Sequence, residues 1–218
     1  MEVFRILPYA RELVDGLLGC DLIGFHVDEY VRNFVEGARV LLKANGRGDT
    51  IRWRGRLTEV QAHPIGIDVA HFEQMADNPK VEKQAQEIRE DVGTSHLLLG
   101  VDRLDYTKGI LERLLAFEYF LQQNPDYHRR VSLLQIATPS RERVGSYRRL
   151  KREVDEVIGR INGTFGLGGW VPVHYLFRGL PQPDLVALYR AARTMLVTPL
   201  KDGMNLVSKE YCAVDLDG

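Results

Sequence analysis

HLLLGV at residues 96–101 is the first of four short apolar runs that decide the fold we expect for this chain. The other three runs are VSLLQIA at 131–137, VPVHYLF at 171–177 and TMLVT at 194–198. Helical periodicity follows each run, near residues 109–122, 142–160, 182–192 and 204–213. Continuous apolar strands that alternate with helices are typical of a parallel sheet covered on both faces. The pattern therefore predicts an α/β domain wound as successive βαβ units, that is, a Rossmann-like domain.

The chain ahead of these runs also predicts α/β structure, but less of it. The expected elements are amphipathic helices at 9–18 and 28–43, a strand at 21–25, a glycine-rich turn at 44–50 and two short strands within 51–67. The polar stretch that ends near residue 91 predicts a solvated helix, and we place the domain boundary there. The expected domains are residues 1–90, which are incomplete, and residues 91–218. INGTFGLGGW at 161–170 is expected to form a surface loop.

Composition and charge exclude several classes of function. A formal net charge of −1 over 218 residues provides no overall field for nucleic acid or an anionic membrane. An anionic ligand must therefore be held by a local cluster of basic groups. No apolar run approaches the roughly 18 residues of a membrane span. Cys20 and Cys212 lie far apart, with no spacing typical of zinc sites or of a disulfide framework. A cytoplasmic protein with a small ligand fits these features best.

The segment DRLDYTKG at 102–109 follows the first apolar run and carries two cations. Ligands of open parallel sheets bind beyond the carboxyl ends of the strands. Arg103 and Lys108 would lie at such an end, in a loop before a helix whose free N–H groups attract anions. Together they could hold a diphosphate. The alternative is that Arg103 pairs with Asp102 or Asp105 at the surface, while Lys108 is only solvated.

The segment PLKDGMNLVSKE at 199–210 follows the last apolar run and is the most informative stretch of the chain. Asp202 and Gly203 would form a turn at the start of a helix. The amides that would donate to sugar hydroxyls there are those of Met204, Asn205 and Leu206. Glu210, about two turns further on, could accept hydrogen bonds from a ribose diol. The alternative makes Asp202 a helix N-cap and Glu210 half of a salt bridge.

Weaker candidates follow two other strand ends. Ser140 could cap the helix after the run at 131–137, and Arg141 would then project from its first turn, where a cation opposes the helix dipole. His26 follows the strand at 21–25. The sequence contains no GxSxG, GxxxxGK[ST] or HExxH motif, and its six histidines have no metal-ligand spacing. Serine hydrolases, P-loop nucleotidases and zincins are therefore disfavoured, and no metal site is expected.

Several of these segments together resemble a known family. In order along the chain, the blocks are GVDRLDYTKG, QIATPSR, GRINGTFG, WVPVHYL and VTPLKDGMNLVSKEY, and they resemble the signature blocks of trehalose-6-phosphate synthases. The upstream blocks RILP, LLGCDLIGFH and PIGID agree with the same family. The resemblance covers essentially the whole chain, with several long motifs at family spacing, so chance is a poor explanation.

The resemblance implies a retaining glycosyltransferase of the GT-B type, with two Rossmann-like domains of which the N-terminal one is incomplete in this chain. The C-terminal domain would bind UDP-glucose, and the N-terminal domain would bind glucose 6-phosphate. The products would be α,α-trehalose 6-phosphate and UDP. UDP-glucose is a co-substrate in this reaction, and neither a cofactor nor a metal ion is required.

The resemblance also assigns a role to each candidate residue. Arg103 and Lys108 would hold the UDP diphosphate and stabilise the charge of the leaving group. Asp202 and the amides from Gly203 to Leu206 would hold the donor glucose. The remaining contacts would be Glu210 with the ribose, the backbone near Leu180 with uracil, His26 with the donor glucose, and Arg141 with the phosphate of the acceptor.

The sequence departs from the family pattern at both ends. The glycine-rich loop and most of the acceptor pocket, which precede the block at Glu2 in the family, are absent, and the chain stops at Gly218 before the C-terminal sheet is closed. We therefore expect a fragment with little or no synthase activity alone. Two alternatives stay open, a glucosylglycerol-phosphate synthase and a non-catalytic nucleotide-sugar-binding protein. The sequence also does not determine whether the chain forms a homo-oligomer, which base the donor nucleotide carries, or how the truncation arose.

Overall fold

The computed structural model describes residues 4–140 and 144–214, and the chain divides into two compact units, Met1–Gly66 and Ile67–Gly218. The boundary expected near residue 90 therefore lies between Gly66 and Ile67. The polar helix that suggested the later boundary belongs to the second unit. Its buried residues Val81 and Ala85 lie in the hydrophobic core of that unit. Its polar residues are not all solvated, since Gln84 donates to Asp184 at 3.1 Å and Arg89 donates to the carbonyl oxygen of Arg190 at 2.8 Å.

The first unit is a small α/β unit with a four-stranded mixed sheet. Its helical elements are η1 (Phe4–Ile6), α1 (Ala10–Leu17) and α2 (Asp28–Leu42). Its strands are β1 (Leu22–Phe25), β2 (Asn45–Arg47), β3 (Thr50–Trp53) and β4 (Arg56–Ala62), in the order β1-β4-β3-β2. Only β1 and β4 pair in parallel. The expected turn at 44–50 contains β2, where Gly46 lets the backbone approach the side chains of Val35 and Arg39.

The second unit contains a four-stranded, entirely parallel sheet in the order β7-β6-β5-β8. Its strands are β5 (His96–Arg103), β6 (Val131–Thr138), β7 (Val173–Leu176) and β8 (Thr194–Met195). Its helices are α3 (Val69–Ala76), α4 (Pro79–Val92), η2 (Tyr106–Lys108), α5 (Ile110–Gln123), η3 (Pro125–Tyr127), α6 (Gly145–Phe165), α7 (Gln182–Ala191) and α8 (Leu206–Val214). All four expected strands and the four helices that follow them are present, with ends shifted by a few residues.

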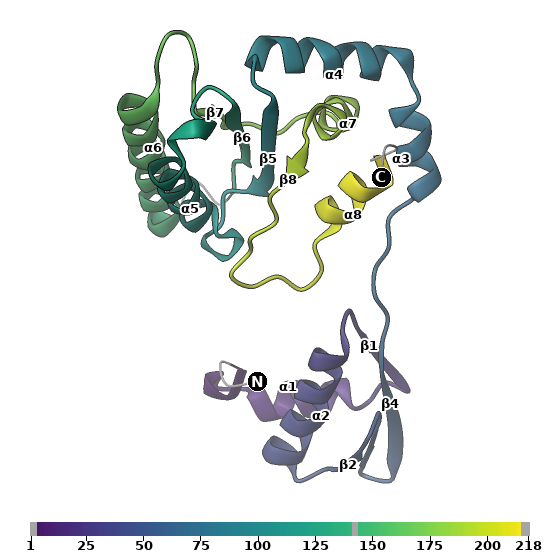
Figure 1. Cartoon of the computed structure of the whole chain (residues 1–218). Coiled ribbons are helices and arrows are strands. Elements are labelled where there is room, and N and C mark those ends of the chain that lie inside the picture. The colour runs from purple at the N-terminus through teal and green to yellow at the C-terminus, as the bar shows by residue number, and fades with distance from the viewer. Residues whose placement is uncertain (1–3, 141–143, 215–218) are drawn as a thin grey trace. The chain divides into compact units, whose positions relative to one another are not determined.

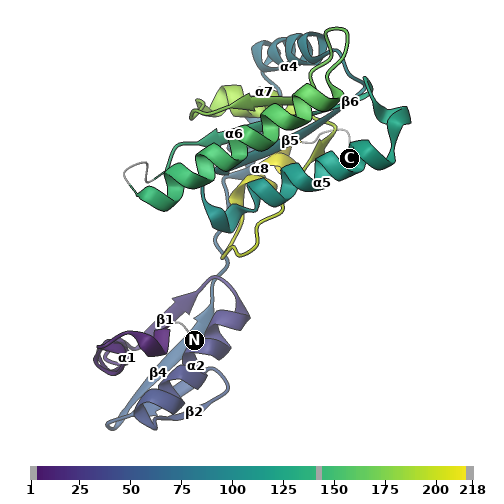
Figure 2. The same ribbon diagram turned by 90° about the vertical axis from the view of Figure 1, so that its left-hand side faces the viewer.

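Helices cover both faces of this sheet, as Figures 1 and 2 show. Helices α5 and α6 lie on one face, and α4, α7 and α8 lie on the other (Figure 1). Side chains of β6 alternate between the two cores, with Leu133 in the α5–α6 core and Leu134 in the opposite core. The apolar runs of the two central strands, β5 and β6, are continuous because both faces of these strands are buried.

The loop expected at 161–170 is partly helical. Helix α6 continues to Phe165, since Ile161 lies at helical spacing from Val154 and Ile158 in the α5–α6 core. Trp170 is also buried and donates a hydrogen bond to the carbonyl oxygen of Val131 at 3.0 Å. The exposed surface loop is therefore shorter than expected and is formed by residues 166–169, between the end of α6 and Trp170.

Gly100, in the middle of β5, provides space for a buried polar cluster. A β-carbon at this position would overlap the guanidinium of Arg113 and the side-chain amide of Gln135. Both of these side chains are buried. A close-packed interior has no room to move them aside.

We expect Gly100→Ala to lower the free energy of unfolding by about 1–3 kcal/mol, the range for overpacked cores. Urea unfolding followed by circular dichroism measures this loss. The control is Gly163→Ala in α6, where an added methyl group meets no atom within 4 Å and alanine favours the helix. Equal losses of stability in the two variants would contradict this account.

Candidate functional site

The loops that follow β5 and β8 meet at the C-terminal edge of the second sheet. The backbone N–H groups of Leu200 and Lys201 both donate to the carbonyl oxygen of Thr107, at 2.9 and 3.2 Å. Gly109 adopts a φ of 64° beside the carbonyl oxygen of Thr198, where a β-carbon would overlap that oxygen. Glycine is therefore required at residue 109 both for its conformation and for this close approach. The two loops form one continuous surface.

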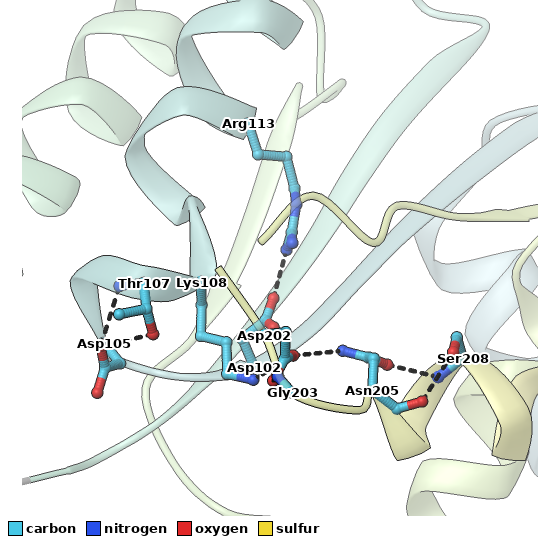
Figure 3. A network of polar contacts seen from close by, with 9 residues as sticks. All are labelled: Asp102, Asp105, Thr107, Lys108, Arg113, Asp202, Gly203, Asn205 and Ser208. Atoms are coloured by element: carbon cyan, nitrogen blue, oxygen red, sulfur yellow. Dashed lines mark hydrogen bonds and ion pairs between the residues drawn. The ribbon is translucent and has the colours of Figure 1, made fainter. Parts of the chain in front are cut away.

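Lys108 and Asp202 join these loops through an ion pair (Figure 3). The Nζ of Lys108 lies 2.6 Å from Oδ2 of Asp202, and the two side chains are 15% and 21% exposed. Asp202 also accepts hydrogen bonds from the N–H of Gly203 at 3.0 Å and from Nδ2 of Asn205 at 3.3 Å. Burial acts to raise the pKa of Asp202, but the bonds from Lys108 and Asn205 outweigh it, and the pKa is lowered. Lys108 is thus not merely solvated, as the alternative interpretation had it.

Asp105 holds the loop after β5 in shape. Its Oδ1 accepts hydrogen bonds from the N–H and the hydroxyl of Thr107, both at 2.9 Å, and its Oδ2 accepts one from the Tyr147 hydroxyl at 3.0 Å. Burial acts to raise the pKa of Asp105, and the bonds from Thr107 and Tyr147, with the charge of Arg103, lower it overall. The carboxylate is therefore ionised and committed to the loop and to α6.

Arg103 is exposed at the end of β5 and forms no hydrogen bond or ion pair with any residue that the structure describes. The surface pairs expected in the alternative interpretation do not form there. Asp102 pairs with Arg113, and Asp105 bonds to Thr107 and Tyr147. The guanidinium of Arg103 is accordingly available for a ligand at this edge of the sheet.

A buried arginine lies directly behind this surface (Figure 3). Nη1 of Arg113 donates to Oδ2 of Asp102 at 2.7 Å and to Oε1 of Gln135 at 2.9 Å, and its Nε donates to the hydroxyl of Thr198 at 3.0 Å. The side chains of Arg113 and Asp102 are only 1% and 5% exposed. Burial raises the pKa of Asp102, and the charge of Arg113 acts in the opposite direction. One guanidinium thereby ties β5, β6 and the segment after β8 together.

The sequence contains a signal for this cluster that the motif analysis did not use. Arg113 lies on the apolar stripe of α5, between the buried residues Ile110 and Leu114. A cation on the buried side of a helix requires a buried acceptor. The available partners were Asp102, near the end of β5, and Gln135, within the apolar run of β6.

Helix α8 begins later than expected, and a different residue caps it. Asn205 is the cap, because its Oδ1 accepts the N–H of Ser208 at 2.8 Å. Asp202 is therefore not the N-cap. Gly203 and Met204 lie in the loop before the helix. The N–H groups of Met204 and Asn205 donate to none of the described residues and are available at the edge of the sheet.

Glu210 lies on α8, and its partner is a tyrosine rather than a cation. Oε2 of Glu210 accepts a hydrogen bond from the hydroxyl of Tyr189 on α7 at 2.9 Å. Within the described ranges Glu210 forms no ion pair. The salt bridge of the alternative interpretation is thus absent from this part of the chain. Motif inspection had no reason to select Tyr189, since it lies within an apolar helix.

Three further candidates lie elsewhere. Leu180 follows β7 and packs against the core shared by α3, α4, α7 and α8. His26 is exposed after β1, in the first unit, so the structure does not relate it to the loops of the second unit. Arg141 lies outside the described residues. The second unit thus brings together Lys108, Asp202 and the loop from Gly203 to Leu206.

Metal sites and membrane-spanning helices are absent from the described residues. Over 4–140 and 144–214, no three His, Cys, Asp or Glu side chains are grouped so that they could hold a metal ion. Cys20 and Cys212 are free and exposed. No helix in these ranges is long and apolar enough to cross a membrane. The absence of a cofactor remains a prediction.

The lowered pKa of Asp105 gives its contribution to stability a definite pH dependence. Since that pKa lies below 3.8, the contribution is complete at neutral pH and is lost as the pH falls through 3.8 and below. Asp105→Asn should reduce the free energy of unfolding at pH 7 by about 1–3 kcal/mol, and this difference should narrow in acid. Urea unfolding across a pH series measures it, with the exposed Asp126→Asn as control. A difference that is constant with pH would contradict the assignment.

Comparison with known proteins gives the family. Residues 1–217 match Glycosyltransferase family 20. The 56 kDa subunit of alpha,alpha-trehalose-phosphate synthase [UDP-forming] from Saccharomyces cerevisiae is 41% identical over 97% of this chain and 43% of its own length. The alpha,alpha-trehalose-phosphate synthase of Burkholderia xenovorans, solved in complex with glucose-6-phosphate, superposes with a TM-score of 0.89 at 36% identity, over 98% of this chain and 48% of that one.

A chain from E. coli bound with UDP-2-fluoro glucose superposes with a TM-score of 0.91 at 33% identity, over 98% of this chain and 47% of that one. The chain thus spans about half the length of the relatives that it matches. These structures confirm the expected GT-B fold, of which this chain forms a part. The chain belongs to glycosyltransferase family 20.

Proposed function

We propose that this chain is the donor-binding part of an enzyme that transfers glucose from UDP-glucose to glucose 6-phosphate. The products are α,α-trehalose 6-phosphate and UDP. The observation that carries the proposal is the joined pair of loops at the C-terminal edge of the second sheet. That surface presents Lys108 against Asp202, the uncommitted Arg103, and free amides beside them. Membership of family 20 supports the same reaction.

The diphosphate of UDP binds to Arg103 and Lys108 in this proposal. The Lys108 ammonium has three N–H donors, and the ion pair with Asp202 leaves donors for phosphate oxygens. Arg103 adds a planar group suited to two phosphate oxygens at once. Negative charge grows on the diphosphate as the bond to glucose breaks. The two cations stabilise that charge and so lower the barrier.

The glucose and the uridine bind to the adjacent residues. Asp202, held in place by Lys108 and Asn205, accepts hydrogen bonds from hydroxyl groups of the glucose. The available amides of Met204 and Asn205, in the loop from Gly203 to Leu206, donate to other hydroxyl groups of the glucose. Glu210 accepts hydrogen bonds from the hydroxyls of the ribose. The backbone near Leu180, beyond the end of β7, contacts uracil. The UDP-2-fluoro glucose bound by the E. coli chain supports a donor of this class.

The transfer proceeds with retention of configuration at the glucose carbon. The bond from that carbon to the UDP oxygen breaks, and the acceptor hydroxyl forms a new bond on the same face. The departing phosphate takes the proton of that hydroxyl, so no carboxylate of the protein has to act as nucleophile. The protein supplies orientation and electrostatic stabilisation.

Glucose 6-phosphate is the proposed acceptor, and its phosphate binds to Arg141. His26 contacts the donor glucose. The glucose-6-phosphate complex of the Burkholderia xenovorans relative supports this acceptor and disfavours a glycerol phosphate acceptor. The cytoplasm is the proposed location, since both cysteines are free, as a reducing compartment requires.

We expect the chain to bind UDP in isothermal titration calorimetry. Arg103→Ala and Lys108→Ala should each weaken binding by about tenfold to a hundredfold, the effect of losing a hydrogen bond to a charged group. The matched controls are Arg130→Ala, at the opposite edge of the sheet, and Lys83→Ala, whose ion pair with Glu87 on α4 is exposed. Absence of UDP binding at millimolar concentration, or equal losses in the controls, would overturn the proposed donor site.

A further inference from the structure

Tyr189 and Glu210 form a contact between α7 and α8 that the reaction described above does not explain. Tyr189 is 2% exposed, and its hydroxyl donates to Oε2 of Glu210 at 2.9 Å. The other carboxylate oxygen, Oε1, accepts no hydrogen bond from the described part of the chain. Glu210 is therefore held at one oxygen by a buried donor, while its second oxygen is free for another partner.

The tyrosine that makes this bond is rigid. Its ring lies in the core between α7 and the sheet and packs edge-on against Tyr211, with ring centroids 6.3 Å apart and an interplanar angle of 89°. Burial, followed by the negative charge of Glu210, raises the pKa of the Tyr189 hydroxyl, which therefore remains a protonated donor. A fixed donor on one oxygen restricts the rotamers of a glutamate that would otherwise sample several.

We propose that Tyr189 is a positioning residue that fixes Glu210 for recognition of the ribose diol, and that the pair sets a preference for ribonucleotide over deoxyribonucleotide donors. The inference rests on the proposed function, in which Glu210 binds the ribose. A carboxylate with a fixed orientation can accept hydrogen bonds from both hydroxyls of the diol. A site built to bond a hydroxyl discriminates against a ligand that lacks it, since the acceptor is then left without that hydrogen bond.

The chain offers a matched pair of substitutions for a test. Tyr189→Phe removes the hydroxyl that bonds to Glu210 and keeps the ring. Tyr211→Phe removes a neighbouring hydroxyl, which donates to the carbonyl oxygen of Ala192 at 3.4 Å. Thermal unfolding of both variants measures the loss of stability that is common to removing a phenolic hydroxyl from this core.

Calorimetric titration with UDP and with 2′-deoxyuridine diphosphate then measures the preference. We expect the unsubstituted chain to bind UDP about tenfold more tightly than the deoxy compound, which corresponds to one hydrogen bond to a charged group. In Tyr189→Phe the ratio should fall to about twofold or less, and in Tyr211→Phe it should stay near tenfold. In a Glu210→Ala background, Tyr189→Phe should have no further effect on the ratio.

The possible failures are distinguishable. If the unsubstituted chain does not bind UDP, the proposed function is overturned, and this inference falls with it. If the unsubstituted chain binds UDP but does not prefer it over the deoxy compound, the inference alone is overturned. The same holds if Tyr189→Phe and Tyr211→Phe both keep the ratio of affinities of the unsubstituted chain. A loss of UDP affinity in Tyr189→Phe with an unchanged ratio would likewise assign Tyr189 a merely structural role.

Discussion

The ion pair between Arg113 and Asp102, 2.7 Å apart and almost fully removed from water, is the contact on which the rest of the second unit depends. Two charges in a protein interior are stable only when each is paired and hydrogen-bonded. Gln135 and Thr198 supply the additional bonds. Because Asp102, Gln135 and Thr198 come from β5, β6 and the segment after β8, the hydrogen bonds of one guanidinium join three separate parts of the chain.

The same constraint reaches the functional surface. Asp102 precedes Arg103 in the chain, and Thr198 lies four residues before Asp202. The charges of Lys108 and Asp202 act on the carboxylate of Asp102, which links the buried pair electrostatically to the partly buried pair at the surface. A donor site that stabilises growing charge requires groups that do not reorganise during the reaction. The buried pair provides such a rigid support behind two loops that would otherwise be free to move.

The carboxylates of this region have divided roles. Among the residues that the structure describes, Asp105 bonds to Thr107 in its own loop and to Tyr147 of α6, and Asp102 bonds to the buried arginine. Glu210 is held at one oxygen by Tyr189, whereas both oxygens of Asp202 accept hydrogen bonds, one from Gly203 and the other from Lys108 and Asn205. A carboxylate in a fixed orientation suits recognition of sugar hydroxyls.

Local sequence determined the α/β pattern, the four parallel strands, their helices and the strand-end position of Arg103, Lys108 and Asp202, because apolar periodicity and turn residues act over a few neighbours. Tertiary structure alone decided the unit boundary, the extension of α6 and the partners of the charged residues. The polar stretch of α4 concealed Val81 and Ala85, which place that helix in the second unit. Lys108 and Asp202 are separated by most of the second unit, and their pairing depends on which strands lie side by side. The resemblance to a family supplied roles for the residues, but not the contacts through which Arg113 and Tyr189 hold them.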